Sequence, residues 1–308
     1  MNPHQDKSSP PVVSMDYKSG FVAIIGAPNA GKSTLLNRFL GQKISITSRK
    51  PQTTRNRILG VMHLPKAQMI FIDTPGIHKT REDFNAKMVE RAFAALEDVD
   101  LILAMADAAD PDVESENLFV NHLKGLRKPV ILALNKIDRL DKDRLPGLAA
   151  SWSAVHPFLA VIPISARHGT RMPELLEIME TALPQGPPLF PDETLTDMSE
   201  RFITGEMIRE KVFRLTGQEI PYATAVTVER FTEKKGGSLI SIDAVIHLEK
   251  DSQKGILIGK GGSKLKQIGE AARKDIERMT GAKVYLKLFV RVQKNWSKDT
   301  RALQRFGY

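Results

Sequence analysis

With 308 residues, of which 42% are hydrophobic and 26% charged, the chain has the composition of a globular protein and room for two domains with separate cores. It contains no cysteine, which excludes disulfides, thiolate metal sites and cysteine nucleophiles. The formal net charge of +9 lies entirely in the last third, because residues 1–199 hold 23 Lys and Arg against 23 Asp and Glu, whereas residues 200–308 hold 22 against 13. A basic last third suggests a polyanionic partner, although a merely basic surface remains an alternative.

The N-terminal segment MNPHQDKSSPPVV lacks the basic-then-apolar order of a signal peptide. No apolar run approaches the roughly 20 residues needed to cross a bilayer. We therefore expect a cytosolic protein in which residues 1–18 form a mobile tail.

Residues 19–184 alternate short apolar runs with amphipathic segments of helical length. The runs are FVAII (21–25), QMIFI (68–72), LILAMA (101–106), VILAL (130–134) and LAVIPI (159–164). Apolar strands separated by helices are typical of a parallel sheet that is covered on both faces. This segment is predicted to be an α/β domain.

A proline-rich segment, LPQGPPLFPDE (183–193), divides the chain, and we expect a linker at 185–200. Beyond it the pattern predicts a helix at 202–215, strands at 222–231 and 238–248, a long helix at 263–279 and a strand at 283–292. Residues 201–308 are thus predicted to form a smaller α+β domain.

The stretch GAPNAGKS (26–33) fits the pattern G-x4-G-K-[S/T] and lies between a predicted strand and a predicted helix. Backbone N–H groups in such a loop hold a diphosphate. Lys32 would reach the terminal phosphates, and the Ser33 hydroxyl would bind Mg²⁺.

Three further short motifs follow predicted strands and so share the ligand-binding edge of the sheet. DTPG (73–76) would place the Asp73 carboxylate near the metal and the Gly76 N–H near a phosphate. In NKID (135–138), Asp138 can accept from the two N–H donors of guanine, which adenine lacks, while Asn135 and Lys136 hold the base. In SAR (165–167), the Ala166 N–H could donate to the guanine carbonyl oxygen.

A second glycine loop, GILIGKGG (255–262), lacks a hydroxyl residue after its Gly-Lys pair and follows a polar segment. It fits the I-G-x-x-G signature of KH domains, in which glycines let RNA phosphates approach the backbone and Ile256, Leu257 and Ile258 offer an apolar groove for bases. The alternative is a helix N-terminus with accidental glycines. The candidate RNA-binding residues are Ile256, Ile258, Gly259, Lys260, Gly261, Gly262, Lys264, Lys266, Arg273 and Lys274.

Together, GAPNAGKST, QTTR, DTPG, NKID, SAR and the second glycine loop resemble the Era family of GTPases, from about Lys18 to Tyr308. The resemblance implies a P-loop GTPase domain with a mostly parallel sheet and helices on both faces, followed by a type II KH domain. It implies slow GTP hydrolysis, binding of 16S rRNA near its 3′ end, and a role in assembly of the 30S subunit. It also implies a cytoplasmic monomer, and relatives associate peripherally with the inner membrane, although the sequence shows no strong amphipathic anchor.

The resemblance also assigns the nucleotide and metal contacts. Segment 41–57 would be the first switch, rather than a plain polar loop, with Thr54 closing over Mg²⁺ beside Ser33 and Asp73, and Thr53 as the alternative. Lys32, Thr54, Gly76 and Asn29 are the candidate catalytic residues. The candidate contacts to GTP or GDP are Gly26, Ala27, Pro28, Asn29, Ala30, Gly31, Lys32, Ser33, Thr34, Asp73, Thr74, Pro75, Gly76, Asn135, Lys136, Asp138, Ser165, Ala166 and Arg167.

The position after the DTPG motif is Ile77, where Ras-like enzymes have a glutamine that orients water. Related GTPases with a hydrophobic residue there use K⁺ held partly by a P-loop asparagine, and Asn29 occupies that place. Asn29 as an ordinary turn residue after Pro28 is the alternative. Trp296 is expected to pack against the second domain rather than to stack on a base.

Two other functions remain open at this point. The chain could be an RNA scaffold in which the nucleotide is structural. It could also be a GTPase that serves RNA modification, although such relatives rely on catalytic cysteines or partner-binding domains.

Overall fold

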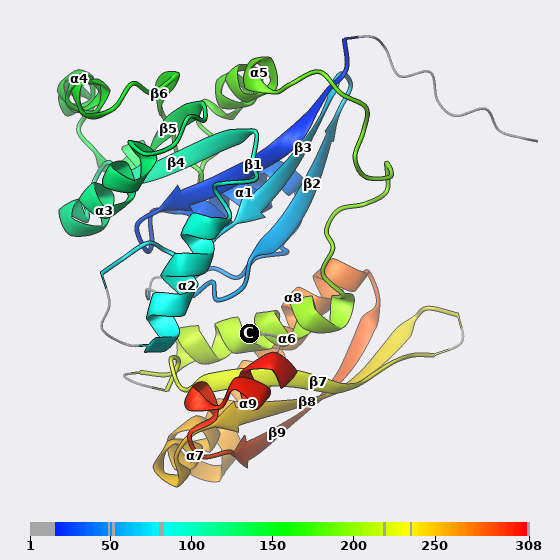
Figure 1. Cartoon of the computed structure of the whole chain (residues 1–308). Coiled ribbons are helices and arrows are strands. Elements are labelled where there is room, and N and C mark those ends of the chain that lie inside the picture. The colour runs from blue at the N-terminus through cyan, green and yellow to red at the C-terminus, as the bar shows by residue number, and fades with distance from the viewer. Residues whose placement is uncertain are drawn as a thin grey trace, which may run out of the picture.

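The computed structural model describes residues 16–48, 50, 53–79, 83–217, 220–234 and 236–306. Most of the expected N-terminal tail, residues 1–15, and Gln52 of the QTTR motif lie outside the described residues. Figure 1 shows a larger α/β part above a smaller sheet with its own helices, with the segment after α5 running down one side between them. None of the helices in the described segments has the length and apolar character of a membrane span.

The first sheet has six strands in the order β2-β3-β1-β4-β5-β6. All neighbours are parallel except β2, which is antiparallel to β3. The predicted mostly parallel sheet is confirmed, whereas β2 was not foreseen. The strands are β1 (Lys18–Gly26), β2 (Ile58–Leu64), β3 (Ala67–Asp73), β4 (Leu101–Asp107), β5 (Val130–Asn135) and β6 (Ala160–Pro163).

Helices cover both faces of this sheet, as predicted. Val22 and Ile24 of β1 face α1 (Lys32–Leu40) and α5 (Met172–Ala182), whereas Ala23 and Ile25 face the other core. That second core lies under α2 (Asp83–Ala94), α3 (Val113–Leu123) and α4 (Leu145–Val155). The 3-10 turns η1 (Ile137–Arg139) and η2 (Lys142–Arg144) precede α4.

The segment expected to be a linker contacts strands β1, β2 and β3 of the first sheet. Its backbone bridges to β1 at Gln185 and to β2 at Thr196. Gln68 of β3 is fully buried, and its side-chain oxygen accepts from the N–H groups of Leu189 and Phe190 at 2.7 and 2.9 Å while its amide donates to the Phe190 carbonyl. These hydrogen bonds hold the proline-rich segment against the sheet.

The second sheet has the order β7-β8-β9, with β7 antiparallel and β9 parallel to β8. Its elements are α6 (Glu200–Leu215), β7 (Thr224–Glu233), β8 (Leu239–Leu248), α7 (Asp251–Ile258), η3 (Lys260–Gly262), α8 (Ser263–Thr280), β9 (Lys283–Val292), η4 (Trp296–Lys298) and α9 (Thr300–Arg305). The predicted order of helix, two strands, long helix and strand is confirmed. The additional α7 was missed because its polar sequence buries only Gln253 and Leu257.

Trp296 is completely buried, donates from Nε1 to the Ala223 carbonyl at 3.3 Å and packs edge-on against Phe306. The expectation that it packs against the second domain is confirmed, and stacking of this ring on a base is excluded in this conformation.

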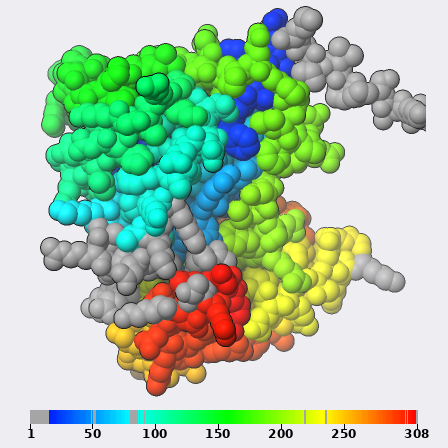
Figure 2. Space-filling view, viewed as in Figure 1, coloured from blue at the N-terminus to red at the C-terminus, as the bar shows by residue number. Residues whose placement is uncertain are grey.

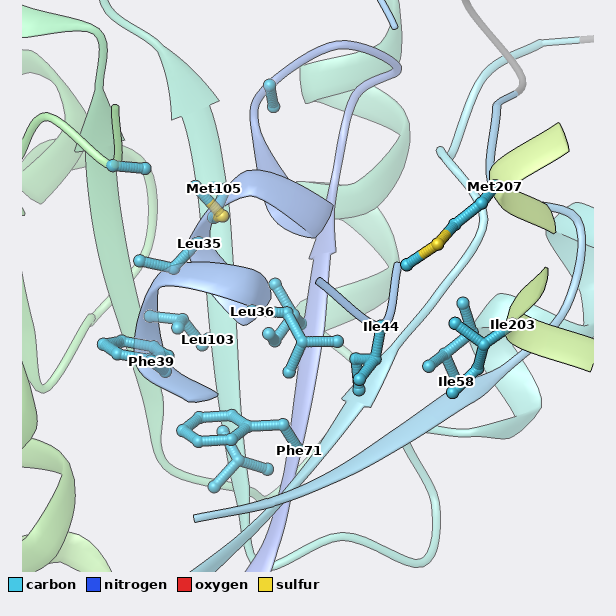
Figure 3. Packing of buried hydrophobic residues seen from close by; sticks show 14 of the residues in the cluster. Leu35, Leu36, Phe39, Ile44, Ile58, Phe71, Leu103, Met105, Ile203 and Met207 are labelled. Atoms are coloured by element: carbon cyan, nitrogen blue, oxygen red, sulfur yellow. The ribbon is translucent and has the colours of Figure 1, made fainter. Parts of the chain in front are cut away.

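Helix α6 joins the two cores. Figure 3 shows Ile203 and Met207 of α6 beside Ile58 and Ile44 of the first part, and all four belong to one cluster of buried side chains. Because the same helix also packs on β7 and α8, a displacement of α6 would shift side chains that pack on both sheets.

Candidate functional site

The first glycine loop connects β1 to the N-terminus of α1 with a backbone that few side chains tolerate. Its φ angles are +148° at Gly26, +62° at Asn29 and +106° at Gly31. A Cβ on Gly31 would lie 2.2 Å from Asn135 Nδ2, so this position requires glycine for space as well as for conformation.

Lys32 is buried at the start of α1, and its Nζ donates to the carbonyls of Gly26 and Ala27 at 3.0 and 2.9 Å. Burial lowers the pKa of this ammonium group to about 8, although the nearby Asp73 carboxylate opposes the shift. A phosphate would supply the compensating negative charge that the loop carbonyls supply only in part.

The three candidate metal ligands meet at one point. Ser33 Oγ donates to Asp73 Oδ2 at 2.8 Å and lies 2.9 Å from Thr54 Oγ1. Ser45, which sequence reasoning missed, also donates to Asp73 Oδ2 at 2.8 Å. Burial raises the pKa of the Asp73 carboxyl, and Lys32 and the two serine hydroxyls offset this only in part.

The arrangement fits a hard divalent cation. Asp73 Oδ1 is buried without a hydrogen-bond partner among the described residues, and a cation would satisfy it. Thr53, the alternative to Thr54, instead donates from its hydroxyl to the Lys50 carbonyl at 2.8 Å. No group of three or more His, Asp or Glu side chains suited to a metal occurs in the described segments, so a metal here would share its coordination with hydroxyls and phosphates.

At the other end of the cleft, Asn135 ties two loops together. Its Nδ2 donates to the Ala30 carbonyl at 2.7 Å and its Oδ1 accepts from the Ala166 N–H at 2.9 Å. That N–H was expected to serve a guanine carbonyl, which would have to share it with Asn135. Asp138 accepts from the Ser165 hydroxyl at 2.6 Å, and this bond leads the causes that lower the pKa of its carboxyl.

Asp107 at the end of β4 is a further site residue that sequence reasoning missed. Its Oδ2 pairs with Lys136 Nζ, and its Oδ1 accepts from the backbone N–H groups of Ala109 and Asp110. The available signal was a polar residue that ends the buried run LILAMA, at the same edge of the sheet as DTPG and NKID.

Most of the predicted nucleotide contacts line one continuous cleft, and the remainder lie behind its walls. The lining residues are Pro28, Asn29, Gly31, Lys32, Ser33, Thr34, Thr54, Gly76, Asn135, Lys136, Asp138 and Arg167. Gly26, Ala27, Ala30, Asp73, Thr74, Pro75, Ser165 and Ala166 support this lining from behind. Ile77 is fully buried in the second core of the sheet, and therefore cannot orient a water in the cleft.

Phe213 and Arg214 of α6 also line this cleft, so the second part of the chain reaches the nucleotide side of the first. Figure 2 shows the light-green segment around residue 200 lying directly against the blue strands of the first part.

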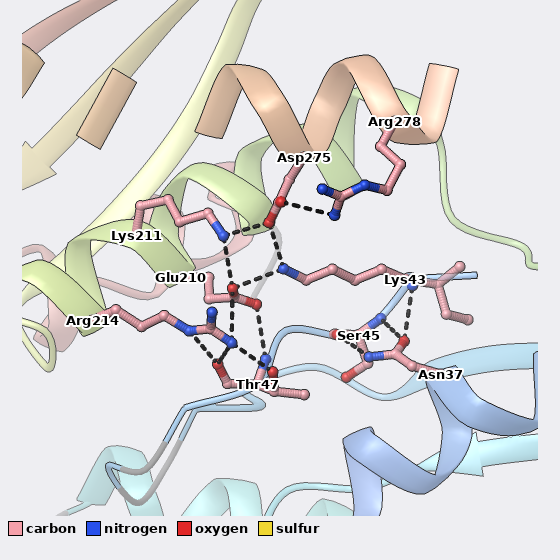
Figure 4. A network of polar contacts seen from close by, with 10 residues as sticks. Asn37, Lys43, Ser45, Thr47, Glu210, Lys211, Arg214, Asp275 and Arg278 are labelled. Carbon is pink, nitrogen blue, oxygen red and sulfur yellow. Dashed lines mark hydrogen bonds and ion pairs between the residues drawn. The ribbon is translucent and has the colours of Figure 1, made fainter. Parts of the chain in front are cut away.

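The first-switch segment is fastened to α6 and α8 by a charged network (Figure 4). Lys43 Nζ lies 2.7 Å from both Glu210 of α6 and Asp275 of α8. Glu210 also accepts from the Thr47 N–H at 3.0 Å, and Lys211 pairs with both carboxylates. The Glu210 side chain has no exposed surface, so the network forms a buried seam between the two parts.

Two arginines and a lysine extend the same seam. Arg55 donates to the carbonyls of Thr224 and Tyr222 at 2.9 and 2.7 Å, and Lys50 donates to the carbonyl of Phe213 at 2.7 Å. Arg209 of α6 donates back to the carbonyl of Thr53. These long-range bonds follow no local pattern and were not predicted.

The second glycine loop lies between α7 and α8. Gly259, Gly261 and Gly262 have φ angles of +73°, +62° and +79°. A Cβ on Gly259 would lie 2.8 Å from the Cβ of Lys264, whereas a Cβ on Gly261 or Gly262 would meet nothing within 4 Å. The backbone at the last two glycines is therefore open to a ligand.

The candidate RNA-binding side chains around this loop differ in exposure, and one expectation is wrong. Ile256 is 56% exposed and Ile258 half-buried, but Leu257 is fully buried in the core of the domain and cannot form part of an apolar groove. Lys260, Lys266 and Lys274 are exposed, whereas Lys264 and Arg273 are half-buried, with Arg273 paired to Glu277 at 3.3 Å.

Comparison with known proteins gives two domain matches. A family described as 50S ribosome-binding GTPase matches residues 21–136, and the KH domain family matches residues 219–297. The chain is 53% identical to GTPase Era of Geobacter metallireducens and 51% identical to GTPase Era of Geotalea uraniireducens, in each case over 95% of this chain and 98% of the relative.

Solved structures agree with these matches. A crystal structure of Era in complex with MgGDPNP and nucleotides 1506–1542 of 16S ribosomal RNA superposes with a TM-score of 0.88 at 41% identity, covering 95% of this chain and 99% of that one. A variant of Aquifex aeolicus Era bound to GDP·AlF₄⁻ superposes with a TM-score of 0.89 at 39% identity, covering 94% and 99%.

Proposed function

The chain belongs to the GTPase Era family, and from this membership and the geometry of the cleft we propose that it binds and hydrolyses GTP and binds 16S rRNA near its 3′ end. We further propose that it does so in the cytoplasm during assembly of the small ribosomal subunit. The observation that carries the nucleotide part is the convergence of Ser33, Thr54 and Asp73 at one end of a cleft that has Asp138 at the other.

Backbone N–H groups at the start of α1 hold the phosphates, and Lys32 exchanges its two loop carbonyls for phosphate oxygens. Ser33, Thr54 and Asp73 hold Mg²⁺, which supplies positive charge to the phosphate oxygens when bound. Water then adds to the terminal phosphorus, and the bond to GDP breaks to release phosphate.

At the base, Asp138 accepts from the two N–H donors of guanine, and its lowered pKa keeps it ionised. Inosine lacks the exocyclic amino group, so wild-type protein should prefer GTP to ITP. The Asp138→Ala variant should bind both weakly and with equal affinity. A retained preference for GTP in that variant would assign guanine recognition to other residues.

Catalysis of hydrolysis is assigned in part to K⁺ held by Asn29, since Ile77 has no polar group and is buried. Asn29 lines the cleft, as a K⁺ ligand would. Its backbone is left-handed, which is also common for an asparagine in a turn. GTP turnover is measured in K⁺ and in Na⁺, each with and without the 16S rRNA fragment. This experiment tests whether the chain hydrolyses GTP and whether K⁺ accelerates hydrolysis. We expect faster turnover in K⁺ than in Na⁺, and no such difference in Asn29→Ala. If no GTP is hydrolysed under any of the four conditions, the function as an RNA scaffold with a structural nucleotide is favoured instead.

RNA binding is assigned to the glycine loop at Gly259–Gly262. Gly261→Asp should place a carboxylate against the RNA backbone and abolish RNA binding while GTP turnover without RNA is unchanged. Gly147→Asp, which adds the same charge to an exposed glycine of α4 that also has open space around it, is the matched control. Loss of both activities in Gly261→Asp would indicate a folding defect instead.

The switch contacts suggest how the two activities are linked. Thr54 lies beside Ser33, and four residues of the same segment, Lys43, Thr47, Lys50 and Arg55, bond to the second part of the chain. Ordering of the segment around GTP and Mg²⁺ would therefore change the position of the RNA-binding part, and RNA must in return change GTP affinity by the same factor. Equal GTP affinity with and without RNA would exclude this linkage.

A further inference from the structure

Strand β9 carries an exposed stripe that the GxxG loop does not account for. Its alternate residues Lys283, Tyr285, Lys287, Phe289 and Arg291 all point to the outer face of the second sheet. Tyr285 is 54% exposed and Phe289 is 51% exposed, which is unusual for two aromatic rings on one strand. We call this set the outer stripe.

The outer stripe lies opposite the core. The intervening residues, such as Val284, Leu286 and Leu288, pack with α6 and α8. On the outer face, Tyr285 and Lys287 lie beside Ser241 and Asp243 of β8. On the same face, Ala302 of α9 packs with Trp296 and Phe306 on Ala225 of β7, and Phe306 lies near His247 of β8, whose neighbour on β9 is Arg291.

The order of side chains along the stripe matches the chemistry of a nucleic acid strand. Two planar rings alternate with three cations, and Lys287 Nζ lies 5.5 Å from the centre of the Tyr285 ring. Residues four apart on a strand are separated by about 13 Å, so each ring has room for its own stacked base. The cations between and beside the rings would meet the phosphates.

The charges on this face favour an anionic partner. The carboxylates of Asp243 and Glu229 are paired with Arg230 and Arg291, at 3.0 and 3.6 Å. Within the described part of the chain, no carboxylate pairs with Lys283 or Lys287. Lysines are depleted from the centres of protein interfaces. In a membrane-binding face, apolar groups lie deeper than a rim of cations, whereas here the two alternate along one flat strand.

The stripe lies on the opposite face of the sheet from α7 and the GxxG loop, and the two faces meet along the edge strand β9. Strand β9 ends beside α7, the helix that leads into the GxxG loop, as Figure 1 shows. We propose that the outer stripe is a second contact surface for single-stranded RNA, on which Tyr285 and Phe289 each stack on a base. This inference rests on the proposed RNA-binding function, and it extends the bound RNA from the loop onto the outer face of the sheet.

The test is an RNA-binding titration with the full chain. The probe is the 16S rRNA fragment of nucleotides 1506–1542, labelled for fluorescence anisotropy, together with truncations down to about 6 nucleotides. Replacing both rings in Tyr285→Ala/Phe289→Ala should weaken binding of the long fragment at least about fivefold per ring lost. The shortest fragment that still binds at the GxxG loop should keep its wild-type affinity.

Two control variants make the result specific to stacking. Tyr285→Phe/Phe289→Tyr keeps both planar rings and should bind like wild type. Leu159→Ala removes an equally exposed apolar side chain, 56% exposed, from the first part of the chain and should change nothing. The inference would be overturned if wild type and the double alanine variant bound the long fragment with equal affinity. It would also be overturned if Leu159→Ala lost as much affinity as the double alanine variant.

Gly261→Asp separates this inference from the proposed function. If wild type binds no RNA, both fail. If Gly261→Asp abolishes binding but the double alanine variant binds like wild type, only the outer stripe fails. Reduced binding of the double alanine variant to phosphatidylglycerol vesicles, with unchanged RNA affinity, would reassign the stripe to a membrane surface and overturn the inference.

Discussion

Replacing Lys43 by methionine should uncouple the two parts of the chain without touching the nucleotide site. Lys43 is the only residue of the first part, within the described segments, whose ammonium group bridges Glu210 and Asp275. Burial alone would raise the pKa of Glu210, but Lys43, the Thr47 N–H and Lys211 outweigh it and lower the pKa, so the carboxylate is ionised at neutral pH. The variant would leave Glu210 with Lys211 and Arg214, and Asp275 with Lys211 and Arg278.

The magnitude follows from the burial of the partners. Exposed ion pairs contribute about 0.2–1 kcal/mol, and breaking a buried pair costs about 3–5 kcal/mol. The side chain of Lys43 is 28% exposed while that of Glu210 is fully buried, so the contact lies between these limits. With Lys211, Arg214 and Arg278 retained as partners, we expect a loss of about 2 kcal/mol, or roughly 30-fold in an equilibrium constant.

The assay is RNA affinity measured with GDP and with a non-hydrolysable GTP analogue. If the switch segment changes its contacts with α6 and α8 when GTP binds, the ratio of the two affinities should shrink by up to the same factor of about 30 in Lys43→Met. Arg278→Met is the matched control, because Arg278 also contacts Asp275, at 3.4 Å, but lies on the same helix and is 80% exposed. An unchanged affinity ratio in Lys43→Met, or an equal change in Arg278→Met, would refute the reasoning.

Three further predictions concern stability and the phosphate loop. Burial, with help from Arg291 and Arg305, lowers the pKa of His247 to about 4, so the unfolded chain binds a proton that the folded one does not between pH 6.5 and 4. Folding stability should fall by up to about 3 kcal/mol over that range, and urea titrations of His247→Gln should show a smaller fall. Gly31→Ala should abolish GDP binding, measured by calorimetry, because its Cβ would displace the amide of Asn135, whereas normal affinity would show that the loop adapts. Gln68→Leu should lower the free energy of unfolding in urea by about 1–3 kcal/mol, since it removes three part-buried hydrogen bonds to the backbone of Leu189 and Phe190, and an unchanged midpoint would mean that these bonds do not hold the segment at Phe190.

The sequence predicts the nucleotide end of the molecule well because the chemistry there is local. Each motif follows a continuous apolar strand, and parallel strands bring their carboxyl ends to one edge whatever the rest of the chain does. Ser33 and Asp73 therefore meet as expected, although 40 residues separate them. The GxxG loop is predictable for a similar reason, since positive φ angles and close backbone approach require glycine.

The same reasoning could not find the contacts between the two parts. Lys43 and Asp275 are 232 positions apart, and nothing in the local pattern of either residue distinguishes it from an ordinary surface charge. Leu257 was wrongly assigned to the apolar groove because its neighbours Ile256 and Ile258 are also apolar. These residues lie in helix α7, where Leu257 faces the core. Strand β2 was missed because Gly60 and His63 interrupt its short apolar run, ILGVMHL.

The coupling proposed above would run through α6, from the candidate metal site to the GxxG loop. Thr54 lies 2.9 Å from Ser33, and the carbonyl of the preceding Thr53 accepts from the buried guanidinium of Arg209. Movement of Thr54 toward a metal must move that carbonyl, because the two residues share a peptide unit. Arg209 is fixed by two bonds to Glu206 of the same helix, so the displacement is passed to α6 as a whole. Helix α6 in turn packs along α8, whose first turn follows the GxxG loop, so the proposed coupling predicts that the loop moves when the candidate metal site is filled.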